Sequence, residues 1–219
     1  RSRAMESALV VGEALVDVVR DAAGGVVEHA GGSPANVAVA LSRLGRATTL
    51  VTQYADDRLG AVLDAHLRGE GVEVARQQPR SGRTSSADAR LDPDGAASYV
   101  FDLEWSIAAW SPPEPPVVAH TGSLGAVVAP GAARVRAILD AARPHATVTY
   151  DLNIRPSAMG PLDEVREAAL ALAAVADVVK ASDEDLEHLY PGTDPETAAR
   201  LLLDLGPAGR LALGEQPSG

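Results

Sequence analysis

Short apolar runs alternate with amphipathic stretches along most of this chain. Runs rich in Val, Leu and Thr predict strands, whereas apolar side chains three to four positions apart predict helices. Strands are predicted within residues 8–19, 47–53, 117–120, 146–150 and 176–181. Helices are predicted at about 34–44, 56–71, 131–142, 162–175 and from about 183 onward. This alternation predicts an α/β fold with a mainly parallel sheet and right-handed crossovers.

Two segments depart from the alternation, because each reads as a pair of strands joined by a turn. They cover residues 15–29 and 84–105, and the second contains the turn sequence DPDG at 92–95. We expect the two hairpins to pack together as a small second sheet beside the main one. A sheet in that position would serve as a lid over a ligand.

The segment GGSPANVAVALSRLG, residues 31–45, opens the first predicted helix. Its glycine pair, Gly31 and Gly32, is consistent with a tight turn and also with a hinge that lets a ligand approach the backbone. Asn36 lies in the first turn, where it either caps the preceding turn or binds ligand hydroxyl groups. Three apolar residues at helical spacing predict the core side of this helix: Val37, Leu41 and Leu44.

Polar side chains gather where predicted strands end, which is where ligands bind in open α/β sheets. Asp17 interrupts an apolar run, so it either faces solvent or meets a ligand hydroxyl. Asp151, Asn153 and Arg155 follow the strand that ends at 150. They are ordinary loop residues or a site in which Arg155 meets a phosphate or a polyol. In the second case Asp151 and Asn153 would orient water around magnesium.

The stretch VVKASDED, residues 178–185, carries three further candidates at the end of another predicted strand. Ser182 and Asp185 have the spacing of a capping box, although that motif prefers Glu or Gln at its last position. Lys180 is the only lysine of the chain, and its ammonium group suits a phosphate oxygen or the nearby carboxylates.

Composition and charge exclude several classes of function. A formal net charge of -11 disfavours nucleic acid and an anionic membrane surface as partners. Cysteine is absent, which removes thiolate catalysis, and the sequence contains neither a P-loop nor a G-x-G-x-x-G motif. No signal peptide and no apolar run of roughly 20 residues is found. We therefore expect a cytoplasmic protein with a small-molecule partner, and the use of arginine over lysine suggests a bacterial source.

Seven segments, taken together and in order, resemble the ribokinase-like (PfkB) carbohydrate kinases, and among them the bacterial fructokinases. These segments are GEALVD, GGSPANVAVALSRLG, ADDRLG, LDPDGAASYVF, HTGSL, DLNIRP and VVKASDEDL. The resemblance implies a three-layer αβα domain over residues 8–219, incomplete at its C-terminus, with a β-sheet lid formed by 15–29 and 84–105. It also implies transfer of phosphate from ATP to a sugar hydroxyl, fructose first of all. Other sugars, a nucleoside, or sugar binding without catalysis are the alternatives.

The same resemblance assigns roles to particular residues. The sugar contacts would be Asp17, Gly31, Gly32, Asn36, Tyr99 and Phe101. The phosphate and ATP side would be Asp151, Asn153, Lys180, Ser182 and Asp185, with Arg155 stabilising charge during transfer. Magnesium would be held through water by Asp151 and Asp185, a monovalent cation such as K⁺ would assist, and two copies would pair through the lid.

The sequence departs from the family pattern in three places. Ala55 stands where the pattern has a glycine, which requires a negative φ there. The G-A-G-D motif with the catalytic aspartate does not occur in the 219 residues. GPA also runs straight into GRLALGE, and we hypothesise that residues are missing near Ala208. A neutral sugar is favoured because the lid stretch SYVFDLEW offers Asp102 and Glu104 and no arginine for a sugar acid.

Overall fold

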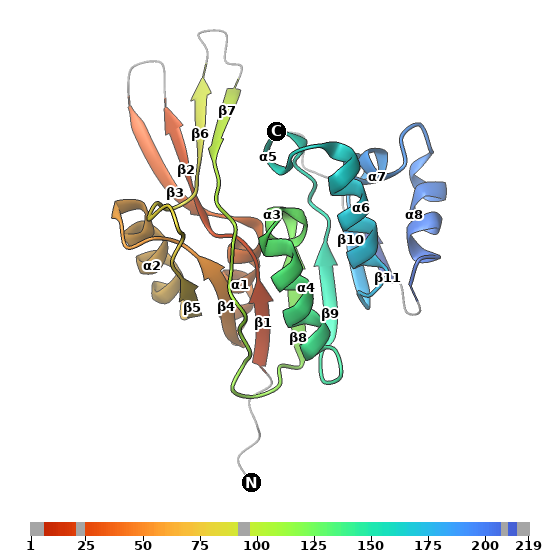
Figure 1. The fold of residues 1–219 in the computed structure, drawn as a ribbon, viewed down its shortest axis with the longest axis horizontal. Helices are drawn as coiled ribbons and strands as arrows, with labels where there is room; N and C mark the ends of the chain where they lie inside the picture. The colour runs from red at the N-terminus through yellow and green to blue at the C-terminus, as the bar shows by residue number, and fades with distance from the viewer. Residues whose placement is uncertain (1–6, 21–24, 92–96, 207–209, 214–219) are drawn as a thin grey trace.

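A seven-stranded, fully parallel sheet forms the body of the protein in the computed structural model, which describes residues 7–20, 25–91, 97–206 and 210–213. The strand order across the sheet is β5-β4-β1-β8-β9-β10-β11 (Figure 1). The strands are β1 Ser7–Val11, β4 Ala47–Gln53, β5 Glu73–Gln77, β8 Val118–Gly122, β9 Thr147–Asp151, β10 Val178–Ala181 and β11 Arg210–Leu213. The chain therefore winds outward from β1 in one direction and then, from β8 onward, in the other.

Helices cover both faces of this sheet. They are α1 Ser33–Arg43, α2 Arg58–Gly69, α3 Ser123–Val127, α4 Gly131–Ala142, α5 Pro156–Met159, α6 Leu162–Ala173, α7 Asp183–Leu189 and α8 Pro195–Leu203. Val10 of β1 belongs to the core under α1 and α2, whereas Leu9 and Val11 belong to the core under α4 and α6. Because successive side chains of a strand point to opposite faces, this split confirms the three-layer αβα architecture.

The two hairpins combine into a second sheet, as predicted. Its strands are β2 Leu15–Arg20, β3 Val26–Gly31, β6 Ser86–Leu91 and β7 Ala97–Asp102, in the order β3-β2-β6-β7. Within each hairpin the strands are antiparallel, and β2 pairs with β6 in parallel. In Figure 1 this sheet, called the lid below, rises beyond the carboxyl ends of the main strands. The DPDG turn at 92–95 lies outside the described residues, as do residues 207–209 around Ala208.

The structure corrects two details of the predicted pattern. The apolar run 8–19 is not one strand, because residues 12–14 separate β1 of the body from β2 of the lid. The buried face of α1 is formed by Pro34, Ala35, Ala38 and Val39, while Val37 and Leu41 lie at its margin. The prediction of Leu44 as core is wrong, since it follows the last helical residue and is 79% exposed. Small side chains on the buried face let the helix lie close to the sheet.

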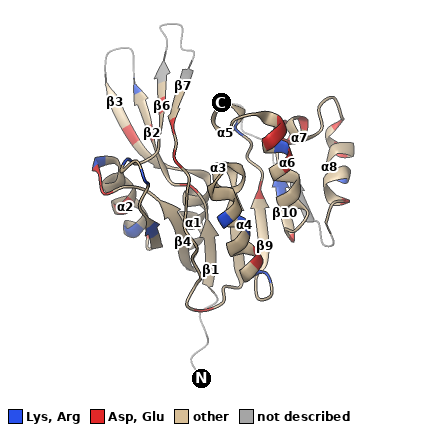
Figure 2. Cartoon of the chain, in the orientation of Figure 1, with Lys and Arg blue, Asp and Glu red and all other residues tan. Residues whose placement is uncertain are grey.

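Acidic residues lie in the first turns of two helices. The first turns of α6 and α7 carry the acidic residues Asp163, Glu164, Asp183, Glu184 and Asp185, and Figure 2 shows acidic residues at the starts of both helices. The positive end of the helix dipole favours carboxylates there. In the part of the chain that the structure describes, no helix is long and apolar enough to cross a membrane.

Candidate functional site

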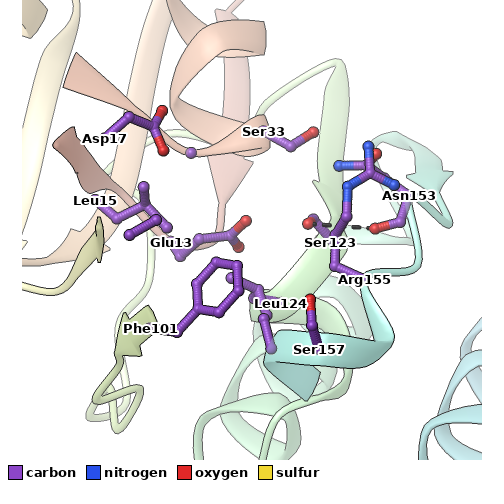
Figure 3. A pocket seen from close by; sticks show the side chains of 13 residues that line it. Glu13, Leu15, Asp17, Ser33, Phe101, Ser123, Leu124, Asn153, Arg155 and Ser157 are labelled. Carbon is purple, nitrogen blue, oxygen red and sulfur yellow. Dashed lines mark hydrogen bonds between the residues drawn. The ribbon is translucent and has the colours of Figure 1, made fainter. Parts of the chain in front are cut away.

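A cavity of about 380 Å³ lies between the lid and the carboxyl edge of the main sheet. Its volume is within the usual range for small-molecule sites. The lining residues come from both bodies: Glu13, Leu15, Asp17, Gly32, Ser33, Ala87, Phe101, Ser123, Leu124, Asn153, Arg155, Ser157 and Ala158. Figure 3 shows the lid residues Leu15, Asp17 and Phe101 on one side and Asn153, Arg155 and Ser157 on the other. The cavity is therefore shared between lid and body.

Asp17 presents a half-buried carboxylate to this cavity from β2. A Cβ atom built on Gly31 would lie 2.3 Å from Asp17 Oδ2, so the glycine is what leaves room for the carboxylate. Burial raises the pKa of Asp17, and His29 on the paired strand opposes that rise. Among the described residues, none donates a hydrogen bond to this carboxylate. The group is therefore placed to accept hydrogen bonds from a ligand.

The glycine pair leads from the lid into α1. Gly32 precedes the helix with φ at 102°, a conformation that a residue with a side chain rarely adopts. Ser33, the first residue of the helix, lines the cavity. Asn36 lies one turn into α1, where its backbone N–H donates to Gly32 O at 2.9 Å and its side chain is exposed, outside the cavity wall. Its role as a sugar contact stays a prediction.

One aromatic residue of β7 lies on the lid side of the cavity. Phe101 lines the cavity and packs against the larger core. Tyr99 lies two positions earlier on the same strand, paired with Ala89 of β6, and its side chain is not among those described. The role of Tyr99 as a sugar contact stays a prediction.

Two residues with strained backbones border the cavity on the body side. Ser123, the first residue of α3, has φ at 53°, and Asn153 has φ at 39°. Positive φ in residues other than glycine is uncommon and gathers at functional sites. Ser123 Oγ donates to Asn153 O at 3.4 Å, the bond drawn in Figure 3. Arg155 follows, with Nη1 donating to Ile154 O at 2.9 Å and its guanidinium group in the cavity wall.

Asp151 and Lys180 form an ion pair at the ends of neighbouring strands. Their Cα atoms are in register between β9 and β10, and Lys180 Nζ lies 3.2 Å from Asp151 Oδ1. Burial raises the pKa of Asp151, and the adjacent ammonium group works in the opposite direction. The pair thus places one positive and one negative group beside the cavity without being part of its wall.

Ser182 and Asp185 form the capping box that their spacing predicts, with Asp in place of Glu. Ser182 Oγ accepts from Asp185 N at 3.1 Å, and Asp185 Oδ2 accepts from Ser182 N at 2.8 Å. Asp185 Oδ1 also accepts from Ile154 N at 2.7 Å, and the residue is 1% exposed. Asp185 therefore holds the loop that carries Asn153 and Arg155.

The described residues do not fit a directly bound metal. They include no group of three or more His, Cys, Asp or Glu side chains that could hold one. Of the two predicted carboxylates, Asp185 is enclosed and bonded to backbone N–H groups, and Asp151 is paired with Lys180. A water-mediated magnesium ion stays a prediction of the family resemblance.

Four polar residues of the cavity were not among the predicted site residues. They are Glu13, Ser33, Ser123 and Ser157. Ser123 follows β8 directly and Glu13 lies two residues after the end of β1, both at the carboxyl edge of the main sheet, so the rule that singled out Asp151 could have found them. Burial raises the pKa of Glu13 to about 7, and backbone N–H groups of α3 oppose the rise. The sequence marks the place of Glu13 at the sheet edge, but only the tertiary structure shows that its carboxyl group is buried against α3.

Residues 5–212 match the pfkB family of carbohydrate kinases. The chain is 31% identical to a fructokinase of Klebsiella pneumoniae over an alignment of 193 residues, which covers 84% of this chain and 63% of the relative. It is 34% identical to fructokinase-1 of Oryza sativa subsp. japonica over an alignment of 202 residues, which covers 84% of this chain and 62% of the relative. The chain thus spans less than two thirds of the length of these curated relatives.

Solved structures share the fold. A fructokinase double mutant from Vibrio cholerae O395, in a form bound to fructose, ADP and potassium, superposes with a TM-score of 0.79. The match covers 98% of this chain and 72% of that one, at 24% identity. A parallel sheet with a four-stranded lid, a cavity between them and a family match over nearly the whole chain agree with one another. The chain belongs to the pfkB family of carbohydrate kinases.

Proposed function

We propose that this chain is the sugar-binding part of an ATP-dependent fructokinase. The observation that carries the proposal is the cavity itself, which combines carboxylates, hydroxyl groups and one guanidinium group under a lid. Such a set of donors and acceptors suits the hydroxyl groups of a sugar. Family membership and the fructokinases among the relatives support fructose as the first substrate to test.

A neutral sugar is favoured over a sugar acid. Arg155 is the only basic side chain among the described residues that line the cavity, while Glu13 and Asp17 contribute two acidic ones. Asp102 and Glu104, the acidic residues of the lid stretch, do not line the cavity. Asp102 is paired with Arg83 at 3.4 Å, and Glu104 accepts from Arg80 N and Ser81 N. The preference for a neutral sugar is kept, with Glu13 and Asp17 as its reason.

In this proposal the sugar is held from both sides. Asp17 would accept hydrogen bonds from sugar hydroxyl groups, the backbone at Gly31 and Gly32 would allow close approach, and Phe101 with Tyr99 would cover the sugar from the lid. Asn36 would reach the sugar only after the lid and the start of α1 move, because its side chain is exposed in this structure. Closure of the lid would exclude water and so limit hydrolysis of ATP.

The nucleotide would approach from the side of Asp151 and Lys180. Phosphoryl transfer depends on positioning and on stabilising the charge of the transferred group. Arg155 lies in the loop after β9 and lines the cavity, where it would neutralise that charge, and Lys180 would meet a phosphate oxygen. Asn153 would contribute through its loop, and Ser182 with Asp185 would position that loop rather than touch the nucleotide. We assign no general base, because the 219 residues contain no G-A-G-D motif.

Three further features are kept as parts of the proposal. A potassium ion would assist; the Vibrio cholerae fructokinase structure contains a bound potassium ion. Two copies would pair through the lid, whose edge strand β3 exposes Val26 and Val27. Location in the cytoplasm is expected from the sequence.

Release of ADP from ATP tests the activity on the complete protein. Fructose, ribose, 2-keto-3-deoxygluconate and adenosine should be compared at equal concentrations, with the binding of each to the 219-residue chain measured by calorimetry. We expect fructose to bind and to give the highest kcat/KM. Fructose binding without ADP release from the complete protein would select a non-catalytic sugar-binding relative. Absence of binding and turnover with all four would overturn the proposal.

A further inference from the structure

The backbone of Gly125 in α3 is hydrogen bonded to two of the chain segments that join the lid to the body. Its N–H donates to Glu13 Oε2 at 2.7 Å, and its carbonyl oxygen accepts from Trp105 Nε1 at 3.0 Å. Glu13 lies between β1 and β2, where the chain enters the lid, and Trp105 follows β7, where the chain leaves it. Two of the four segments that join the lid to the body, referred to below as the lid connections, therefore contact one residue of the body.

The chain is tightly packed around Gly125. A Cβ atom on Gly125 would lie 2.7 Å from Gly12 Cα and 3.1 Å from Glu13 N. On the other side, a Cβ atom on Gly131 would lie 2.3 Å from the indole of Trp105. A Cβ atom at 2.3 or 2.7 Å would overlap with these neighbours, so Gly125 is in direct contact with the segment before β2, and Gly131 with Trp105. A shift of α3 would have to move both lid connections with it.

Glu13 and Trp105 are both almost enclosed, each being 5% exposed. A buried carboxyl group and a buried indole N–H are costly unless they are hydrogen bonded. Glu13 obtains its bonds from α3, through Gly125 N together with contributions from Ser123 and the Leu124 backbone. Ser123 and Leu124 also line the cavity. The same short helix thus holds the lid connections and forms part of the ligand site.

We propose that Glu13 and Trp105 are positioning residues that hold α3, and with it Ser123 and Leu124, in register with the lid and so set the affinity for the sugar. The effect on fructose affinity rests on the proposed function. The bonding of α3 to both lid connections does not, and it can be followed in the free protein through Trp105 itself.

The protonation of Glu13 provides a readout for this contact. Burial raises the pKa of Glu13 to about 7, so its charge changes in an accessible pH range. The charged groups that line the same cavity are Asp17 on β2 and Arg155 after β9, and His29 on β3 acts on Asp17. Neither α3 nor the first turn of α1 carries a charged residue. Protonation of Glu13 removes its charge and weakens the hydrogen bond from Gly125 N. The indole of Trp105, which is bonded to the carbonyl oxygen of Gly125, should respond to that change.

The first experiment follows tryptophan fluorescence against pH in Trp110→Phe, which leaves Trp105 as the only tryptophan. We expect a change in emission with a midpoint near pH 7. Glu13→Gln should abolish it, because glutamine accepts the Gly125 N–H but does not titrate. Asp17→Asn should leave it in place. A midpoint that persists in Glu13→Gln, or a flat profile in Trp110→Phe, would overturn the proposed contact.

The second experiment measures the dissociation constant of fructose by calorimetry. Glu13→Ala should weaken binding about tenfold, since Gly125 N loses its acceptor and α3 is released. Glu13→Gln should stay within about threefold of the parent, and Trp105→Phe should weaken binding about threefold. Glu70→Ala is the control. This variant also removes a hydrogen-bonded carboxylate, the one that accepts from Arg43, but Glu70 lies at the end of α2, away from the cavity.

The two experiments separate the inference from the proposed function. If the parent chain does not bind fructose, the proposed function fails, and the pH profile of Trp105 still decides the contact. If fructose binds equally well to Glu13→Ala and to the parent, the positioning role is wrong although the function stands. Equal weakening in Glu13→Ala and Glu13→Gln would likewise contradict it, because rescue by glutamine distinguishes positioning from a general loss of folding.

Discussion

At the scale of single residues, the cavity depends on a missing side chain. Gly31 does not have positive φ, so a residue with a Cβ atom could adopt its backbone conformation. The first atom that this Cβ would meet is Asp17 Oδ2, at 2.3 Å. The carboxylate is half-buried and can rotate away, which relieves the contact but removes the carboxylate from its position in the cavity.

Gly31→Ala should therefore impair sugar binding more than stability. We expect fructose affinity to fall about tenfold while the free energy of unfolding changes by less than about 1 kcal/mol. Calorimetry and urea denaturation measure the two quantities. Gly69→Ala is the control, because a Cβ atom there meets nothing within 4 Å. Unchanged affinity in Gly31→Ala would remove Asp17 from the sugar contacts.

At the scale of elements, Asp57 connects a helix of the body with a strand of the lid. It caps α2 by accepting from Gly60 N at 2.7 Å, and it accepts from Thr84 N at 2.9 Å and from Thr84 Oγ1 at 2.6 Å. Thr84 lies just before β6, and its hydroxyl also accepts from Ala55 N. Ala55 is not among the described residues with positive φ, so the departure from the family glycine is accommodated without strain.

Asp57→Ala should cost more than the loss of an ordinary helix cap. Asp194 caps α8 through Thr197 N and bonds to nothing in the lid, so Asp194→Ala should cost about 1 kcal/mol. Asp57→Ala also removes the acceptor for Thr84 N and Thr84 Oγ1. We therefore expect the free energy of unfolding to fall by about 2–3 kcal/mol and fructose to bind more weakly. Urea denaturation and calorimetry of both variants test this. Equal costs would show that the bonds to Thr84 contribute nothing to stability.

At the scale of the whole molecule, two sheets share one ligand cavity. The main sheet contributes the turn after β8 and the loop after β9, and the lid contributes β2, β6 and β7. A ligand that contacts both should reduce the motion of one against the other. Helix α8 lies at the far end of the main sheet, beside β11, and does not line the cavity (Figure 1).

Fructose should therefore slow amide hydrogen exchange in β2, β6 and α3, by about tenfold at saturation, and leave α8 unchanged. Mass spectrometry of peptides from these segments measures the rates, with a sugar that does not bind in the calorimetric test as the control. Protection spread evenly over the chain would indicate general stabilisation. Protection absent from the lid would contradict a site shared by the two sheets.

The site itself could be predicted only in part. Asp17, Gly32, Phe101, Asn153 and Arg155 were singled out from the sequence, and all five line the cavity. Asn36 was also singled out but does not line the cavity. The first turn of α1 directs Ser33 to the cavity and leaves Asn36 exposed. Ser182 and Asp185 form the capping box that their spacing predicts, because this motif depends only on residues three apart.

The sequence by itself determined the features that depend on neighbours along the chain. Hydrophobic periodicity marked most of the strands and helices, and turn residues separated the two hairpins. Only the tertiary structure decided that the hairpins join through a parallel pairing of β2 with β6, that residues 12–14 divide the first apolar run, and that Glu13 meets Gly125 across 112 residues of sequence. The reason is physical. A helix or a turn is selected by interactions within a few residues, whereas a buried carboxyl group is stable only where distant segments bring a donor to it.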